Sequence, residues 1–243
     1  MSVAPFLFKK FRVNQDRCAM KVGTDSVLLG VWTSLEKKPF SILDVGAGTG
    51  VLSLILAQRS SATSETVGII DALEIDENAY EQCVENFEQS PWGDTLFCYH
   101  ASLDEFTKEI EDKYDLIICN PPFYSEDFKT ENKQRDLARF QDAMPFGHLI
   151  ESVSKLLSEV GTFNVVIPFK EEGYFIELAA TFKLFPKKIL RIKGNPSSDI
   201  KRSLIEFSFR KSEPIIDSLV IETKRHQYTN DYINLTKDFY LKM

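Results

Sequence analysis

The sequence predicts an α/β fold in which a seven-stranded mixed sheet, mostly parallel with an antiparallel edge, carries helices on both faces. Short apolar runs alternate with segments of helical periodicity along most of the chain, which favours parallel strands joined by helices. A glycine-rich turn follows the first apolar run, where such sheets commonly bind ligands. With 243 residues and 43% hydrophobic content, the chain can build one large core, so we expect a single domain over residues 1–243.

Seven segments have the length and apolar content of strands. The segment 114–119 is apolar after its first two residues, which is typical of a strand buried on both faces. The last two strands are expected to form the antiparallel edge pair. The seven segments are 40–45, 67–75, 95–100, 114–119, 163–167, 187–193 and 203–209.

Helical periodicity fills most of the gaps between these strands. In the segment 76–90, Ala79, Cys83 and Phe87 recur on one face, and Asp76 can cap the first turn. The segment 124–144 breaks the rhythm because it is long, polar and charged, so we interpret it as a substrate-facing loop or as a surface insertion. The expected helices are 49–59, 76–90, 103–110, 146–157 and 173–182.

Composition narrows the classes of function. No apolar run approaches the roughly 20 residues that span a bilayer, and no signal-peptide core follows Met1, so we expect a soluble cytoplasmic protein. The four cysteines form no Cys-x-x-Cys pair and have only three histidines beside them, which argues against a metal site or a disulfide framework. We interpret the cysteines as free, mostly buried thiols.

The net charge of −7 is spread unevenly along the chain. Residues 65–131 hold 18 acidic and three basic residues, whereas residues 183–211 hold nine basic and two acidic ones. The first 21 residues add five basic residues and one acidic residue. The local field governs docking to phosphates more than the total charge does, so the acidic total does not exclude nucleic acid. Ordinary solvated faces are the alternative explanation.

The turn Asp44-Val45-Gly46-Ala47-Gly48-Thr49-Gly50 is the first candidate binding element. Gly46 and Gly48 allow the backbone to turn sharply and to approach a ligand closely. Asp44 would be an odd choice for packing in a buried strand, but at the strand end it can accept a hydrogen bond from a ligand's amino group, directly or through water. A turn of this kind also fits enzymes that bind dinucleotides, so alone it is a weak indication.

Two polar residues follow the next strands. Glu74 ends the second strand, where a carboxylate can accept hydrogen bonds from both ribose hydroxyls of a nucleoside, although a purely structural carboxylate is the alternative. Ser102 follows the third strand, where an adenine ring would lie, but it can equally cap the helix that starts at residue 103.

The sequence Asn120-Pro121-Pro122-Phe123 ends the fourth strand and suggests the chemistry. The lone pair of an exocyclic amino group on adenine is delocalised into the ring, and two acceptors around its hydrogens would localise it. Asn120 can supply a side-chain carbonyl and Pro121 a backbone carbonyl, both held in place by the stiff prolines. Phe123 offers a face on which a base can stack. A simple strand-ending turn is the alternative.

Together with the glycine turn, this motif predicts transfer of a methyl group from S-adenosylmethionine to an exocyclic nitrogen. The methyl sulfonium is already activated, so positioning is most of the task.

These residues resemble the Rossmann-like class I S-adenosylmethionine-dependent N-methyltransferases that carry an Asn-Pro-Pro-Phe/Tyr motif. A more specific resemblance, to the bacterial tRNA1(Val) (adenine-37-N6)-methyltransferases, lies in residues 11–30 and in the ending Asp238-Phe239-Tyr240-Leu241. It implies methylation of N6 of the adenosine beside the anticodon of one valine tRNA. It also implies that residues 1–38 cover the cofactor site, with Lys21, Thr24 and Asp25 helping to close it. Relatives often carry an acidic residue in place of Ser102, so adenine contact here would rely on backbone groups.

The resemblance gives weight to a surface for tRNA along the basic segment, and its candidate contacts are Lys187, Lys188, Arg191, Lys193, Lys201 and Arg202. Other amino groups remain as alternative substrates: N2 of guanine in ribosomal RNA, N6 of adenine in DNA, and the glutamine side chain of a protein. The glutamine enzymes typically carry Tyr at the fourth motif position, where this chain has Phe123. A catalytically silent RNA-binding adapter is the alternative from another class.

Overall fold

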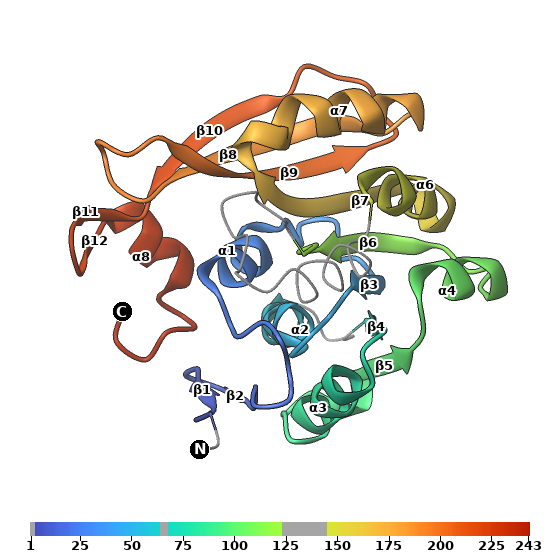
Figure 1. Ribbon diagram of the computed structural model, residues 1–243, viewed down its shortest axis with the longest axis horizontal. Helices are drawn as coiled ribbons and strands as arrows, with labels where there is room; N and C mark the ends of the chain where they lie inside the picture. Colours follow the sequence, from blue (N-terminus) through green and yellow to red (C-terminus); the bar gives the residue numbers. More distant parts are fainter. Residues whose placement is uncertain (1–2, 64–67, 123–144) are drawn as a thin grey trace, which may run out of the picture.

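The computed structural model describes residues 3–63, 68–122 and 145–243. An eight-stranded sheet with the order β10-β8-β9-β7-β6-β3-β4-β5 runs through this part of the chain (Figure 1). It contains all seven expected strands and one more, so the expected count of seven was one too low. The strands are β3 (Ser41–Val45), β4 (Ile69–Glu74), β5 (Leu96–His100), β6 (Tyr114–Cys119), β7 (Leu157–Pro168), β8 (Phe185–Lys193), β9 (Ile200–Ser208) and β10 (Ile215–Val220).

The sheet is mixed and mostly parallel, as the sequence predicts. Only β9 runs against its neighbours β7 and β8, while the other pairs in the sheet are parallel. The β8–β9 pair is antiparallel as expected, but it does not form the edge, because β10 pairs with β8 beyond it. Strand β10 escapes sequence detection because Ile215 and Ile216 are followed by Asp217 and Ser218, so apolar and polar residues do not alternate.

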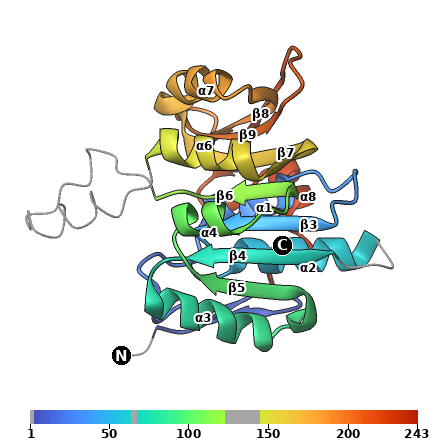
Figure 2. The same ribbon diagram turned by 90° about the vertical axis from the view of Figure 1, so that its right-hand side faces the viewer.

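Helices cover both faces of the sheet (Figures 1 and 2). Adjacent residues of β6 belong to two separate cores: Ile118 packs among side chains of one face and Ile117 among those of the other. The first core holds α1 (Thr24–Trp32), α2 (Val51–Thr63), α3 (Glu77–Glu88) and α8 (Asn230–Thr236). The second holds α4 (Leu103–Glu109), α6 (Phe146–Leu156) and α7 (Glu172–Thr181).

The five expected helices are present with ends within a few residues of the expected ones. Asp76 caps α3 as predicted, with its side chain accepting a hydrogen bond from the Ala79 amide at 2.9 Å. Helices α1 and α8 were not among these five. The smaller elements are β1 (Phe6–Leu7), β2 (Arg12–Val13), η1 (Gly93–Thr95), η3 (Phe169–Glu171), β11 (Glu222–Lys224) and β12 (Gln227–Tyr228).

The N-terminal segment is built into the body of the molecule. Phe8 forms a β-bridge with Tyr240, and the Lys9 amide donates to the Phe239 carbonyl at 2.8 Å, which ties the two ends of the chain together. The Arg17 guanidinium forms ion pairs with Glu81 and Glu85 on α3. This segment therefore leads into α1 along a path fixed at several points.

Helix α1 is anchored tightly against α2. A Cβ atom built at Gly30 would lie only 2.9 Å from Cγ2 of Ile55, so the two helices approach more closely than a larger side chain would allow. The Arg59 guanidinium on α2 then donates to the carbonyls of Gly30 and Thr33, at 2.6 and 2.7 Å, and so satisfies the C-terminal end of α1. Burial lowers the pKa of Arg59 to about 10.

Within the described ranges, no helix is long and apolar enough to cross a membrane. Over the same ranges, no group of three or more histidine, cysteine or carboxylate side chains is arranged to hold a metal ion. The cysteines are free, and Cys18, Cys83 and Cys119 are buried, as expected for packing thiols.

Substituting Gly30→Val tests the close packing of α1. The added methyl groups have no room beside Ile55, so we expect the free energy of unfolding to fall by about 1–3 kcal/mol. Urea unfolding followed by circular dichroism measures the change. Gly173→Val is the matched control, because nothing lies within 4 Å of its would-be Cβ. Equal losses in the two variants would contradict the tight contact.

Candidate functional site

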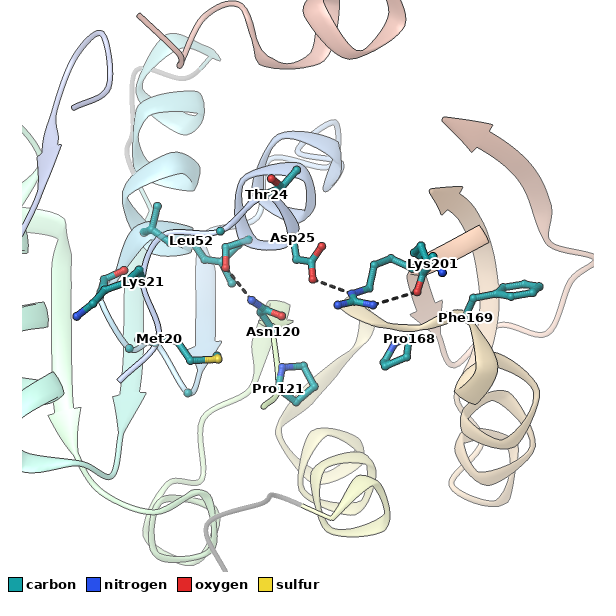
Figure 3. A pocket seen from close by; sticks show the side chains of 18 of the residues that line it. Met20, Lys21, Thr24, Asp25, Leu52, Asn120, Pro121, Pro168, Phe169 and Lys201 are labelled. Atoms are coloured by element: carbon teal, nitrogen blue, oxygen red, sulfur yellow. Dashed lines mark hydrogen bonds and ion pairs between the residues drawn. The ribbon is translucent and has the colours of Figure 1, made fainter. Parts of the chain in front are cut away.

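A cavity of about 820 Å³ opens at the carboxyl ends of β3, β6 and β7, beside the start of β9 (Figure 3). Segments far apart in the sequence meet around it. Its lining residues are Met20, Lys21, Gly23, Thr24, Asp25, Ser26, Gly46, Ala47, Gly48, Thr49, Val51, Leu52, Asn120, Pro121, Pro168, Phe169, Lys170, Asp199, Ile200, Lys201 and Arg202.

The cavity brings together many residues that the sequence analysis selected: Lys21, Thr24, Asp25, Gly46, Gly48, Asn120, Pro121, Lys201 and Arg202. Other selected residues are not part of its lining, and these are Asp44, Glu74, Ser102, Pro122, Lys187, Lys188, Arg191 and Lys193. Phe123 and the segment 124–144 lie outside the described residues.

The glycine turn forms one wall. Amides of Gly46 and Ala47 both donate to the Leu73 carbonyl, at 3.0 and 2.9 Å, which fixes the turn to the end of β4. Gly46 and Gly48 have φ angles of 73° and 55°, a region that favours glycine. A Cβ at either position would meet nothing within 4 Å. The backbone here therefore presents an open surface that a side chain would otherwise occupy.

Asp44 lies fully buried behind this turn. Its Oδ2 accepts hydrogen bonds from the amide and the hydroxyl of Ser53, at 3.2 and 2.8 Å, while its Oδ1 has no partner in the described part of the chain. Burial raises the pKa of Asp44 to about 7, and the Ser53 hydrogen bonds oppose that rise. A buried acceptor without a donor is costly, so Asp44 is well suited to receive a hydrogen bond from a ligand or a bound water.

Glu74 and Ser102, the other two candidates at the carboxyl ends of strands, form hydrogen bonds within the fold. Glu74 accepts hydrogen bonds from the amides of Gly48 at 2.7 Å and of Ile75 and Asp76, both at 2.9 Å. Glu74 thus holds the glycine turn in place, and its oxygens retain lone pairs for further donors. Ser102 caps α4 in a reciprocal capping box with Glu105. The sequence allowed either an adenine contact or a helix cap for Ser102, and the structure has the helix cap.

Asn120 and Pro121 form the floor of the cavity at the end of β6. The Asn120 side chain points into the cavity, and its Nδ2 donates to the Ser26 hydroxyl on α1 at 2.7 Å (Figure 3). Its Oδ1 lies on the other side of the amide, away from this contact (Figure 3). Pro121 is buried and has no amide hydrogen, so the backbone at this corner is stiff.

The first turn of α1 also contacts the opposite wall. Asp25 forms an ion pair with Arg202 on β9, with 2.8 Å between Oδ2 and Nε (Figure 3). The two side chains are 33% and 35% exposed, so the pair contributes little stability, typically about 1 kcal/mol or less. Its consequence is geometric, because it joins α1 to the strand that carries the basic residues.

The basic residues of β8 and β9 fall into two groups. Lys187 pairs with the buried Glu206 at 2.9 Å, and Arg191 pairs with Glu172 on α7 at 2.7 Å. On β8, Ile192 lies opposite Arg202. Lys188 comes four residues earlier on the same strand, which places it about 13 Å farther from the cavity edge. Lys193, by contrast, ends β8 at the cavity edge, opposite Ile200.

Among the lining residues that were not selected from the sequence are Ser26, Phe169 and Lys170. Ser26 is separated from Asn120 by 94 positions. The one signal in the sequence that could have found Ser26 is its place directly after Thr24 and Asp25. Phe169 and Lys170 follow the fifth expected strand in the same way that Asn120 follows the fourth. The rule that ligands bind beyond the carboxyl ends of parallel strands could have identified both.

Comparisons with known proteins agree with this geometry. Residues 20–185 match the family described as the methyltransferase small domain. The chain is 63% identical to a Flavobacterium johnsoniae protein named tRNA1(Val) (adenine(37)-N6)-methyltransferase, over 98% of this chain and 100% of that protein.

Two solved structures share the fold. A predicted O-methyltransferase from Agrobacterium tumefaciens superposes with a TM-score of 0.66 at 16% identity, over 88% of this chain and 96% of the other. Pyrococcus horikoshii TYW2, solved with MeSAdo, gives 0.57 at 13% identity, over 85% of this chain and 70% of the other. At these identities the likeness concerns the fold alone.

Replacing Asp44→Asn tests the burial of this carboxyl group. The folded protein holds its proton up to about pH 7, whereas the unfolded chain releases it near pH 4, so stability falls as the pH rises between these values. Asparagine carries no such penalty. We expect the variant to gain stability over the wild type progressively from pH 4 to 7, on the order of a few kcal/mol, and the difference to level off above pH 7.

Urea unfolding at a series of pH values measures this difference. Asp217→Asn on the exposed face of β10 is the control and should follow the wild type. Parallel stability profiles for the wild type and Asp44→Asn would contradict a raised pKa at Asp44.

Proposed function

The chain belongs to the methyltransferase small-domain family together with the tRNA1(Val) (adenine(37)-N6)-methyltransferases, and we propose its mechanism from that premise. It transfers a methyl group to N6 of adenosine 37 in tRNA1(Val). The observation that carries the proposal is the corner formed by Asn120 and Pro121, which faces the open glycine turn across one cavity. The methyl donor is S-adenosylmethionine, and the anticodon loop is the part of the tRNA that enters the cavity.

The residues present fit this donor. The glycine turn leaves an open backbone surface at Gly46 and Gly48, and Asp44 keeps a buried oxygen without a donor behind it. We assign Glu74 to the ribose hydroxyls, because its carboxylate is already oriented by three amides. Lys21, Thr24 and Asp25 line the side of the cavity formed by the N-terminal segment and close over the donor. When bound, S-adenosylmethionine supplies a sulfonium-activated methyl carbon, whose bond to sulfur breaks as the N6 lone pair attacks.

Asn120 and Pro121 act on the amino group. Its two hydrogens bond to Oδ1 of Asn120 and to the backbone carbonyl of Pro121, which favours a pyramidal nitrogen with a localised lone pair. Both acceptors are fixed before the substrate arrives, so little reorganisation accompanies the reaction. The surplus proton leaves N6 to solvent after transfer, and no side chain needs to act as a strong base. Pro122 stiffens this corner, and Phe123 is assigned to stacking on the adenine.

The tRNA backbone contacts the cations at the cavity edge. We assign Lys201 and Arg202 to this role from the predicted group, and Lys193 at the end of β8 joins them. Lys170 is exposed on the same rim and extends the set. Lys187 and Arg191 pair with buried carboxylates, whereas Asp25, the partner of Arg202, is about one-third exposed. Lys188 lies farther along its strand. Lys187, Lys188 and Arg191 are therefore weaker candidates for phosphate contacts.

Incubating the protein with labelled S-adenosylmethionine and total tRNA tests the function. The tRNA is then digested, and the labelled nucleoside and its tRNA are identified. We expect N6-methyladenosine in valine tRNA. Labelled N2-methylguanosine or labelled protein would point to a different amino group, and donor binding without any transfer would indicate a silent adapter.

The substitution Asn120→Ala separates chemistry from donor binding. It removes the side-chain acceptor, so we expect methyl transfer to fall below detection while the affinity for S-adenosylmethionine changes by no more than about threefold. Calorimetric titration measures the affinity. Asn234→Ala on the exposed face of α8 is the control and should keep full activity. An equal loss of activity and donor affinity would place Asn120 in the donor site instead.

The substitution Lys201→Ala tests the basic rim. Losing one phosphate contact should weaken tRNA binding and reduce the slope of log affinity against log salt by about one. Filter binding over a salt series measures both. Lys37→Ala is the matched control, because Lys37 donates to the Val160 carbonyl at the amino ends of the strands, on the opposite edge of the sheet. An unchanged salt slope for Lys201→Ala would remove Lys201 from the interface.

A further inference from the structure

The hydrogen bond between Asn120 and Ser26 joins two parts of the molecule that the motif alone does not connect. Ser26 lies in the first turn of α1, and its hydroxyl is 2.7 Å from Nδ2 of Asn120 (Figure 3). Both residues line the cavity and both are partly buried. This contact is therefore part of the reaction chamber.

We propose that Ser26 is a positioning residue for the methyl transfer, acting through the side-chain amide of Asn120. The inference rests on the function proposed above and deepens it. An asparagine side chain offers one acceptor, the oxygen, and two N–H donors. Only the oxygen can accept a hydrogen bond from the substrate's amino group. Because Ser26 accepts the bond from Nδ2, the oxygen of Asn120 is left free for that amino group.

The opposite orientation of the amide would be harmful. Rotation by half a turn about the last side-chain bond exchanges the oxygen and the nitrogen, because this torsion is broad and roughly two-fold. An N–H group would then face the N–H groups of the substrate. The amino group would lose one of the two acceptors that bond its hydrogens and localise the N6 lone pair. Anchoring the amide through Nδ2 before the substrate arrives is a form of electrostatic preorganisation.

Helix α1 provides a rigid platform for this contact. Its position is set by the close packing of Gly30 on Ile55 and by the Arg59 hydrogen bonds at its end. Asp25, the neighbour of Ser26, ties the same turn to Arg202 on β9. Ser26 is thus presented from a segment that is fixed at both ends.

The hydroxyl of Ser26 is not needed to begin the helix. Gly23 is the N-cap of α1, and it forms no side-chain capping hydrogen bond there. The usual structural use of a serine in a first turn, as part of a capping interaction, does not account for this residue. Its orientation toward Asn120 fits a role in the site.

Three variants test the inference: Ser26→Ala, Ser26→Thr and, as the control, Ser34→Ala. Ser34 lies just beyond the same helix, and its hydroxyl accepts a hydrogen bond from the Glu36 amide at 3.4 Å. Steady-state kinetics with tRNA and S-adenosylmethionine give kcat and both KM values, calorimetric titration gives donor affinity, and thermal unfolding gives Tm.

For Ser26→Ala we expect kcat to fall by about tenfold, with both KM values and the donor affinity within about twofold of the wild type. Threonine keeps the hydroxyl, so Ser26→Thr should recover most of the loss. Ser34→Ala should behave as the wild type. The split between kcat and KM distinguishes positioning of Asn120 from a general loosening of the site.

Two outcomes would overturn the inference while leaving the proposed function intact: wild-type kcat in Ser26→Ala, or a loss that is matched by lower Tm and weaker donor binding. A loss that threonine fails to recover would also overturn it. If the wild type itself transfers no methyl group to valine tRNA, the proposed function fails instead.

Discussion

The register of the central parallel strands is the constraint on which the site depends. Val45 of β3 lies opposite Leu73 of β4 on one side and Cys119 of β6 on the other. The next residues along these three strands are Gly46, Glu74 and Asn120, so parallel pairing alone brings the glycine turn, its carboxylate and the asparagine to one edge. A slip of one residue in either pair would also turn every side chain of the shifted strand to the other face of the sheet. Core packing and the placement of the site therefore enforce the same register.

The site also contains a residue, Asp44, that destabilises the folded protein. Asp44 is fully buried, its Oδ1 has no donor in the described part of the chain, and its carboxyl group resists ionisation. An apolar residue at this position would pack without that penalty. A ligand or a bound water that supplies the missing donor would satisfy the oxygen and stabilise the folded state. Strain of this kind is expected at functional positions rather than in the framework.

The sequence was sufficient for the central strands, the glycine turn and the Asn120 corner because each has a strong local pattern. It was insufficient where the deciding contact is between distant segments. Nothing local to Ser26 indicates that it meets Asn120, and nothing local to Lys187 indicates that Glu206 neutralises it. Strand β10 was missed because its apolar and polar residues do not alternate. For Ser102 the sequence allowed both an adenine contact and a helix cap, and the structure has the cap. The stacking assigned to Phe123 stays a prediction, because this residue lies outside the described ranges.

The pairing of basic side chains resolves the apparent conflict between a net charge of −7 and the proposed RNA substrate. Lys187 and Arg191 are held by Glu206 and Glu172, so they serve to join β8 to β9 and α7. Lys170 and Lys201 remain exposed on the cavity rim, where Arg202, in a partly exposed pair with Asp25, lies beside them. Phosphates respond to the field at this rim, since charges farther than about 10 Å are largely screened at moderate salt. An acidic protein can therefore dock RNA with a few cations, provided that the fold places them around the cavity.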